Sequence, residues 1–170
     1  MVGGFAALGV YAHVGSAVSH TANAASKAAC AVWQSAVSSE ALYGTQVTAL
    51  SDLRALALEC AEANWDGYGA AAIDELAVRN AEDVLFALPP GIPMPDLAPE
   101  PNGGVSLEWF RSRNQMFSIS VNRGLRLAYA WLDGSDRGHA VARFDQRVIP
   151  AGILEGIKRI ILDDSGVRAA

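Results

Sequence analysis

Residues 103–131 read GGVSLEWFRSRNQMFSISVNRGLRLAYAW, and the apolar side chains in this stretch recur at every second position. Successive side chains of a β-strand point to opposite faces of a sheet, so this alternation predicts strands with one apolar face. The apolar positions are Val105, Leu107 and Trp109, then Phe117, Ile119 and Val121, then Leu125, Leu127, Tyr129 and Trp131. We expect this face to pack on helices while the polar face meets solvent.

Turn-forming residues separate these expected strands. They are Arg113-Asn114, Asn122-Arg123-Gly124 and Asp133-Gly134-Ser135. Connections this short join neighbouring antiparallel strands. Residues 139–144 are a candidate fourth strand, so the sequence predicts an antiparallel meander of three or four strands.

The segments on either side of the meander have the period of a helix. Apolar residues recur at three- and four-residue spacing over residues 47–63, 71–88 and 150–162, which predicts three amphipathic helices. Because the connection between the first two is short, we expect an antiparallel helical hairpin. Six of the seven prolines fall between residues 89 and 101 and predict an extended connector, neither a helix nor a central strand. The expected fold class is α+β.

The N-terminal part of the chain differs from the rest. The chain has 170 residues, but residues 1–39 contain a single charged side chain, Lys27. We therefore divide the chain into an apolar, small-residue helical extension at 1–44 and a single α+β domain at 45–170. The extension is expected to be a helix that docks on something else, or a loosely ordered segment. Residues 2–18 lack the basic start of a signal peptide and the roughly 20 strongly apolar residues of a spanning helix, so a membrane segment is not expected.

Charge and cysteine content narrow the class of protein. Acidic residues outnumber Lys and Arg by 18 to 13, whereas nucleic-acid binders carry clustered basic surface. Seven arginines lie within residues 102–149, but the aromatic residues there share the phase of the apolar face and offer no base-stacking platform. We predict no nucleic-acid binding. Cys30 and Cys60 are isolated and expected to be free thiols, which favours a cytoplasmic location.

Two motifs stand out along the chain: WDGYGA at residues 65–70 and GGVSLEW at residues 103–109. In these motifs the chain resembles a loosely defined group of small bacterial proteins of unknown function, over about residues 46–133. The resemblance implies a helical pair, a proline-rich crossing and a short meander. It also implies antitoxin-like or inhibitor-like binding, because such proteins look like companions of mobile or accessory genes. It transfers no catalytic residue.

The motifs also supply candidate partner-contacting residues. Trp65 can anchor a corner between two helices, while Asp66, Gly67 and Gly69 supply its turns. The exposed tip of that corner makes Asp66 and Tyr68 candidates for contact with a partner. Trp131, at the end of an expected strand, is a further candidate because it is expected to be only partly covered.

The sequence offers no clear set of catalytic side chains that could meet at one site. His13 and His20 are seven residues apart, a rise of about 10 Å on a helix, which is too far to share a zinc ion. No serine or cysteine accompanies a histidine in a nucleophile context, and we expect no metal and no cofactor. The alternative is a small enzyme or ligand-binding domain, whose pocket between the meander and the helical hairpin would use Glu108, Arg126, Tyr129 or His139. Glu108 itself is expected to face a cross-strand arginine.

The favoured function is therefore a non-enzymatic protein-interaction module. Its partner would be another protein or a second copy of the chain, with the N-terminal extension as a natural docking element. Packing signals dominate the sequence, and no convergent catalytic set accompanies them.

Overall fold

The structure is a computed structural model that describes residues 44–162. The extension expected at residues 1–44 therefore lies almost wholly outside the described residues, as do Cys30, His13 and His20.

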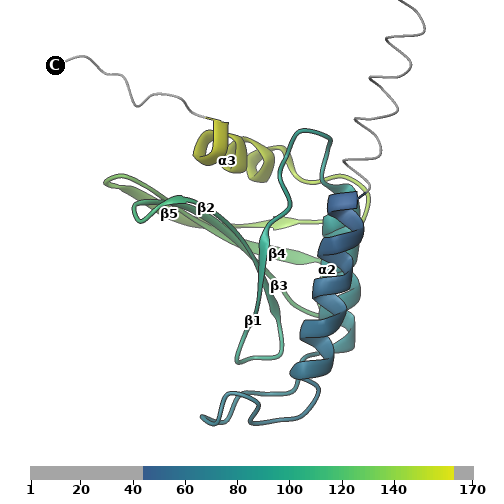
Figure 1. Ribbon diagram of the computed structural model, residues 1–170. Helices are drawn as coiled ribbons and strands as arrows, with labels where there is room; N and C mark the ends of the chain where they lie inside the picture. The colour runs from purple at the N-terminus through teal and green to yellow at the C-terminus, as the bar shows by residue number, and fades with distance from the viewer. Residues whose placement is uncertain (1–43, 163–170) are drawn as a thin grey trace, which may run out of the picture. The chain divides into compact units, whose positions relative to one another are not determined.

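Five antiparallel strands form one sheet in the order β1-β2-β3-β4-β5, so each strand pairs with the next along the chain (Figure 1). They are β1 (Asp96–Pro99), β2 (Val105–Ser112), β3 (Gln115–Val121), β4 (Arg126–Asp133) and β5 (Asp136–Arg143). The predicted α+β class and antiparallel meander are confirmed. The strand number is corrected from three or four to five.

The strand that the sequence did not reveal is β1, inside the proline-rich connector. It pairs with β2 in the register that sets Leu97 opposite Leu107. Prolines are tolerated at the edge of a sheet, where a missing N–H breaks no ladder hydrogen bond. The connector is thus extended, as predicted, but four of its residues form an edge strand.

Three helical segments lie on one side of the curved sheet (Figure 1). The described chain is helical at residues 44–59, and α2 (Glu75–Ala87) and α3 (Ala151–Leu162) follow. Helix α2 begins after Asp74, whose carboxylate accepts a hydrogen bond from the Leu76 N–H at 2.8 Å, a common way to satisfy the first amides of a helix. The predicted C-terminal helix is confirmed.

The two helices before the sheet run antiparallel. Near one end the Gln46 side-chain amide donates to the Leu85 carbonyl at 3.0 Å, and further along Arg54 pairs with Glu82 at 3.3 Å. The connection is longer than predicted, because the first helix ends at residue 59 and residues 60–74 form an ordered loop. The predicted antiparallel direction of the two helices is therefore confirmed, but the predicted short turn is wrong.

The core lies between the sheet and these helices. Its largest fully buried side chains include Leu107, Phe117, Ile119 and Leu127 from the sheet and Leu53, Leu85, Ile153, Ile157 and Ile160 from the helices. Helix α3 packs on β2, β3 and β4, and α2 packs on β2 and β3.

Candidate functional site

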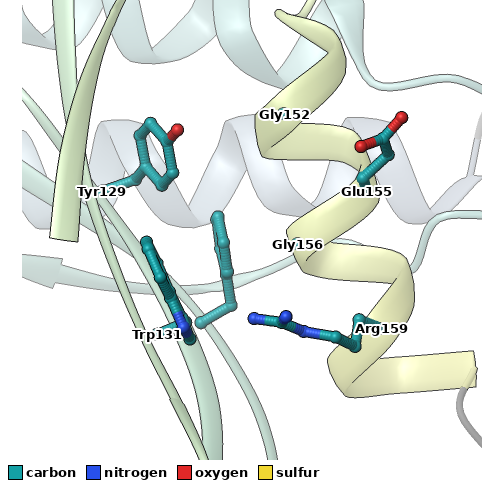
Figure 2. Close-up of a pocket in the computed structure, with 7 residues that line it drawn as sticks. Tyr129, Trp131, Gly152, Glu155, Gly156 and Arg159 are labelled. Carbon is teal, nitrogen blue, oxygen red and sulfur yellow. The ribbon is translucent and has the colours of Figure 1, made fainter. Parts of the chain in front are cut away.

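A hollow of about 340 Å³ lies between α3 and strands β3 and β4 (Figure 2). Its lining residues are Phe117, Tyr129, Trp131, Gly152, Glu155, Gly156 and Arg159. Ligand pockets in proteins occupy roughly 300–1,000 Å³, so this hollow has room for one or two side chains. We call it the α3 hollow.

Two glycines, one helical turn apart on α3, set the shape of the α3 hollow. A Cβ built at Gly156 would lie 2.3 Å from the Phe117 ring carbon Cε2, so only glycine lets the helix approach the sheet here. A Cβ at Gly152 would lie 3.5 Å from the Tyr129 hydroxyl, which is ordinary contact. Gly156 therefore allows close packing, while Gly152 leaves space open in front of Tyr129.

A row of aromatic rings forms the sheet side of the hollow. The Phe117 and Tyr129 rings stack with centroids 5.7 Å apart, and Tyr129 stacks on Trp131 at 6.2 Å. Trp109 continues the row, edge-on to Phe117 at 6.3 Å. The three strands β2, β3 and β4 thus present one continuous apolar surface, which ends at the half-buried Trp131.

Trp131 is held in place by its neighbours but has an unpaired polar atom. The guanidinium carbon of Arg159 lies 5.8 Å from the centre of the Trp131 ring, as expected for a cation–π contact. Arg159 also approaches Asp133, with Nε 3.7 Å from Oδ2. The Trp131 Nε1–H is buried and has no hydrogen-bond partner. An unsatisfied buried donor costs about 1–3 kcal/mol of stability, so the packing around Trp131 leaves one polar group without its hydrogen bond.

The corner at residues 64–71 is tightly built, and it contains Trp65, Asp66 and Tyr68. The Trp65 Nε1–H donates to the Ala71 carbonyl at 3.0 Å. The Asp66 carboxylate accepts from the N–H groups of Tyr68 and Ala70, and these two bonds lower its pKa. Tyr68, at 95% exposure, is the most accessible of the large apolar side chains in residues 44–162. Asp66 is thus occupied by the backbone, and Tyr68 is left as the accessible side chain of the tip.

The four residues of the alternative pocket lie on opposite faces of the sheet. Tyr129 faces the helices, within the α3 hollow. The register places Glu108, Arg126 and His139 on the other face, where Glu108 lies opposite Asp96 and Ser118. The expected cross-strand arginine is not opposite Glu108, whose carboxylate accepts from the Ser106 hydroxyl at 2.9 Å. The structure therefore brings together Tyr129 and Trp131, one from each set of candidates.

Residues 44–162 also bear on whether the chain has a metal site, a membrane span or a reactive thiol. Within residues 44–162 no three His, Cys, Asp or Glu side chains are placed to hold a metal ion. No helix in the same range is long and apolar enough to cross a membrane. Cys60 is a buried free thiol, and burial, followed by the nearby Glu59, raises its pKa. A raised thiol pKa makes Cys60 a poor nucleophile.

Comparison with protein families, with curated proteins and with solved structures finds no match to this chain. Four residues of the α3 hollow, Gly152, Glu155, Gly156 and Arg159, were not identified from the sequence. The only available signal was the spacing of Gly152 and Gly156 by four within an amphipathic helix, which is compatible with close packing anywhere on the sheet.

Proposed function

We propose that this chain is a non-enzymatic protein-interaction module, and that the α3 hollow receives a side chain of its partner. The observation that carries the proposal is the incomplete wall at Trp131. An aromatic surface ends there in the half-buried Trp131 ring, beside an open space large enough for a side chain. A partner side chain that supplies apolar surface would fill this space and cover the exposed part of the ring.

The groups around the hollow favour recognition over catalysis. Its polar side chains are a phenol, a carboxylate and a guanidinium, at Tyr129, Glu155 and Arg159. Both charged residues come from α3: Arg159 extends toward Trp131, whereas the Glu155 carboxylate points away from the rings (Figure 2). Aromatic anchors with charged groups at the rim are typical of protein-binding sites. No serine, cysteine or histidine lines the hollow to act as a nucleophile or base.

The biological form that we propose is antitoxin-like or inhibitor-like binding of another protein in the cytoplasm. The resemblance of the two motifs to small bacterial accessory proteins supports it. Tyr68, at the tip of the corner, would be a separate contact, since its exposed ring has no role in the core and its loop lies at the opposite end of the sheet from α3 (Figure 1).

The experiment is to isolate the tagged full-length chain with its bound proteins from the cells that express it, using three forms. Gly152→Met fills the α3 hollow, and Gly152→Ala is the matched control because its Cβ fits at 3.5 Å from Tyr129. We expect the wild type and Gly152→Ala to retain a defined partner that Gly152→Met loses. Equal retention by Gly152→Met, or no partner in any form, would contradict the proposal.

A further inference from the structure

The outer edge of β5 is open. The Phe144 N–H donates to the Leu125 carbonyl at 2.9 Å, one step beyond the paired residues Arg126 and Arg143. Hydrogen-bonded pairs alternate with non-bonded pairs along an antiparallel ladder, so the even-numbered residues of β5 bond to β4. The N–H and C=O groups that point away from β4 belong to Arg137, His139, Val141 and Arg143. Within the described part of the chain no strand pairs with them.

The sequence of β1 makes the opposite edge of the sheet poorly suited to adding another strand. The Glu100 N–H donates to the Gly104 carbonyl at 2.9 Å, and the same alternation leaves Leu97 and Pro99 facing outward. Pro99 has no N–H, and β1 spans four residues against eight for β5. Short edges with proline resist the addition of another strand. The two edges of the sheet are therefore not equivalent.

The open edge carries concentrated positive charge on its solvent face. Arg126 lies directly opposite Arg143, and Arg137 lies further along β5 on the same face. None of the three forms an ion pair within residues 44–162. Like charges directly opposite each other destabilise a sheet. We call these three arginines the basic strip.

We propose that the β5 edge binds an extended acidic segment of a partner protein, which joins the sheet as a sixth strand. Residues of this segment that bond to the free β5 groups would place their side chains beside the basic strip, where carboxylates are favoured. The alternate side chains would lie on the helix-covered face, beside Ala140 and Ala142, whose small size leaves room for apolar groups, and beside the Trp131 ring that covers Gly138. The partner segment should therefore alternate acidic and apolar residues.

A second copy of the chain fits this edge poorly. A two-fold pairing of β5 with itself centred on Ala140 would set Arg137 opposite Arg143 twice, and both pairs repel. The 61% exposed Val141 would gain cover from such a pairing, but at the cost of this repulsion. The basic strip thus acts against self-association while favouring an acidic strand. This surface is distinct from the α3 hollow, and each can be blocked alone.

The test uses a fluorescein-labelled synthetic peptide of four Glu-Val repeats and the full-length protein. We expect the peptide to bind about tenfold more tightly than its Lys-Val counterpart. In NMR spectra, the chemical shifts of backbone amides should change only in β5 and the residues next to it. Val141→Pro should weaken binding about tenfold, because the Val141 N–H points outward and proline there spares the β4 ladder. Val141→Thr, which keeps the N–H, should bind like the wild type.

Two further measurements keep the proposal falsifiable if Val141→Pro fails to fold. A peptide N-methylated at its glutamates cannot donate to the edge and should bind about tenfold more weakly. Arg143→Glu should reverse the preference between the Glu-Val and Lys-Val peptides. Equal binding of both peptides, or unchanged binding of the N-methylated peptide, would overturn the proposal. A dT12 oligonucleotide that competes for the edge as effectively as the acidic peptide would also overturn it. So would slow hydrogen exchange of the Val141 amide in the protein alone, because that amide would then already have a partner.

Discussion

The indole ring of Trp131 lies against the backbone of Gly138, the residue directly opposite it on β5. A Cβ built at position 138 would lie 2.3 Å from the ring carbon Cζ2. The missing side chain lets the ring extend across the sheet, where it stacks on Tyr129 and forms a wall of the α3 hollow. Aromatic residues covering a glycine on the neighbouring strand are a known stabilising device in sheets.

This relationship predicts the effect of Gly138→Ala. The added methyl group must displace the ring, so the free energy of unfolding should fall by about 1–3 kcal/mol, measured by urea denaturation. The double variant Gly138→Ala/Trp131→Leu separates the causes. If the clash with the ring is the cause, the double variant will lose less stability than the sum of the two single variants. Strict additivity would show that the ring is not responsible.

The two glycines of α3 should respond in opposite ways to alanine. Gly152→Ala meets no clash and gains helix propensity, so we expect stabilisation by about 0.5–1 kcal/mol. Gly156→Ala places its Cβ 2.3 Å from the Phe117 ring, and we expect a net loss of about 1–3 kcal/mol. Thermal unfolding of the two variants side by side measures both. Stabilisation by Gly156→Ala would mean that α3 does not approach Phe117 as closely as described.

Asn80 is the only buried polar residue within residues 44–162, and it joins α2 to the β3–β4 turn. Its side-chain amide donates to the Asn122 carbonyl at 2.8 Å. Asn80→Ala leaves that carbonyl without this donor, so we expect a loss of about 1–3 kcal/mol in chemical unfolding. Arg79→Ala is the control, because it removes an exposed side chain of the same helix that pairs only with Glu75 in the described chain, at 3.6 Å. An equal effect of the two substitutions would contradict the role assigned to Asn80.

The lowered pKa values of three aspartates predict that the folded protein loses stability in acid. The guanidinium of Arg123, followed by the Leu76 N–H, lowers the pKa of Asp74. Backbone N–H groups lower the pKa of Asp66, through Tyr68 and then Ala70, and of Asp145, through Val148 and then Arg147. A carboxylate whose pKa is lower in the folded state stabilises the fold above its unfolded pKa of about 3.9 and loses this contribution as pH falls through the folded value.

The urea midpoint should therefore drop as pH falls below about 4, where the unfolded carboxyls begin to take up protons. A variant with Asp66, Asp74 and Asp145 all changed to Asn should lose less stability over the same range than the wild type does, because these side chains no longer titrate. Arg123→Gln alone should remove part of the acid sensitivity. An identical acid profile for the triple variant would exclude these three carboxyls as the cause.

The strands and helices with strong periodicity could be predicted from the sequence. Val105, Leu107 and Trp109 alternate with polar residues, and all three are buried as expected. The helical period over residues 150–162 likewise predicted α3, in which Ile153, Ile157 and Ile160 are buried. Strand β1 could not be predicted, because prolines suppress the local signal and only pairing with β2 makes Leu97 part of a sheet.

The candidate site was harder to predict because it depends on tertiary packing. Trp131 was expected to be partly covered, but its contact with Gly138 depends on the β4–β5 register. Glu155 and Arg159 are polar residues of an amphipathic helix, a pattern that does not distinguish a binding site from ordinary surface. Their position beside the aromatic row follows from where α3 crosses the sheet, which no local pattern specifies.

The central claim is that a partner protein binds in the α3 hollow, and site-specific photo-crosslinking tests it most directly. The residue p-benzoylphenylalanine would replace Glu155 at the hollow or, as a control, Glu62 in the exposed loop, in cells that express the full-length chain. We predict one discrete crosslinked protein from position 155, none from position 62, and loss of the product when Gly152→Met fills the hollow. No crosslink at position 155, or one that persists with Gly152→Met, would contradict the claim.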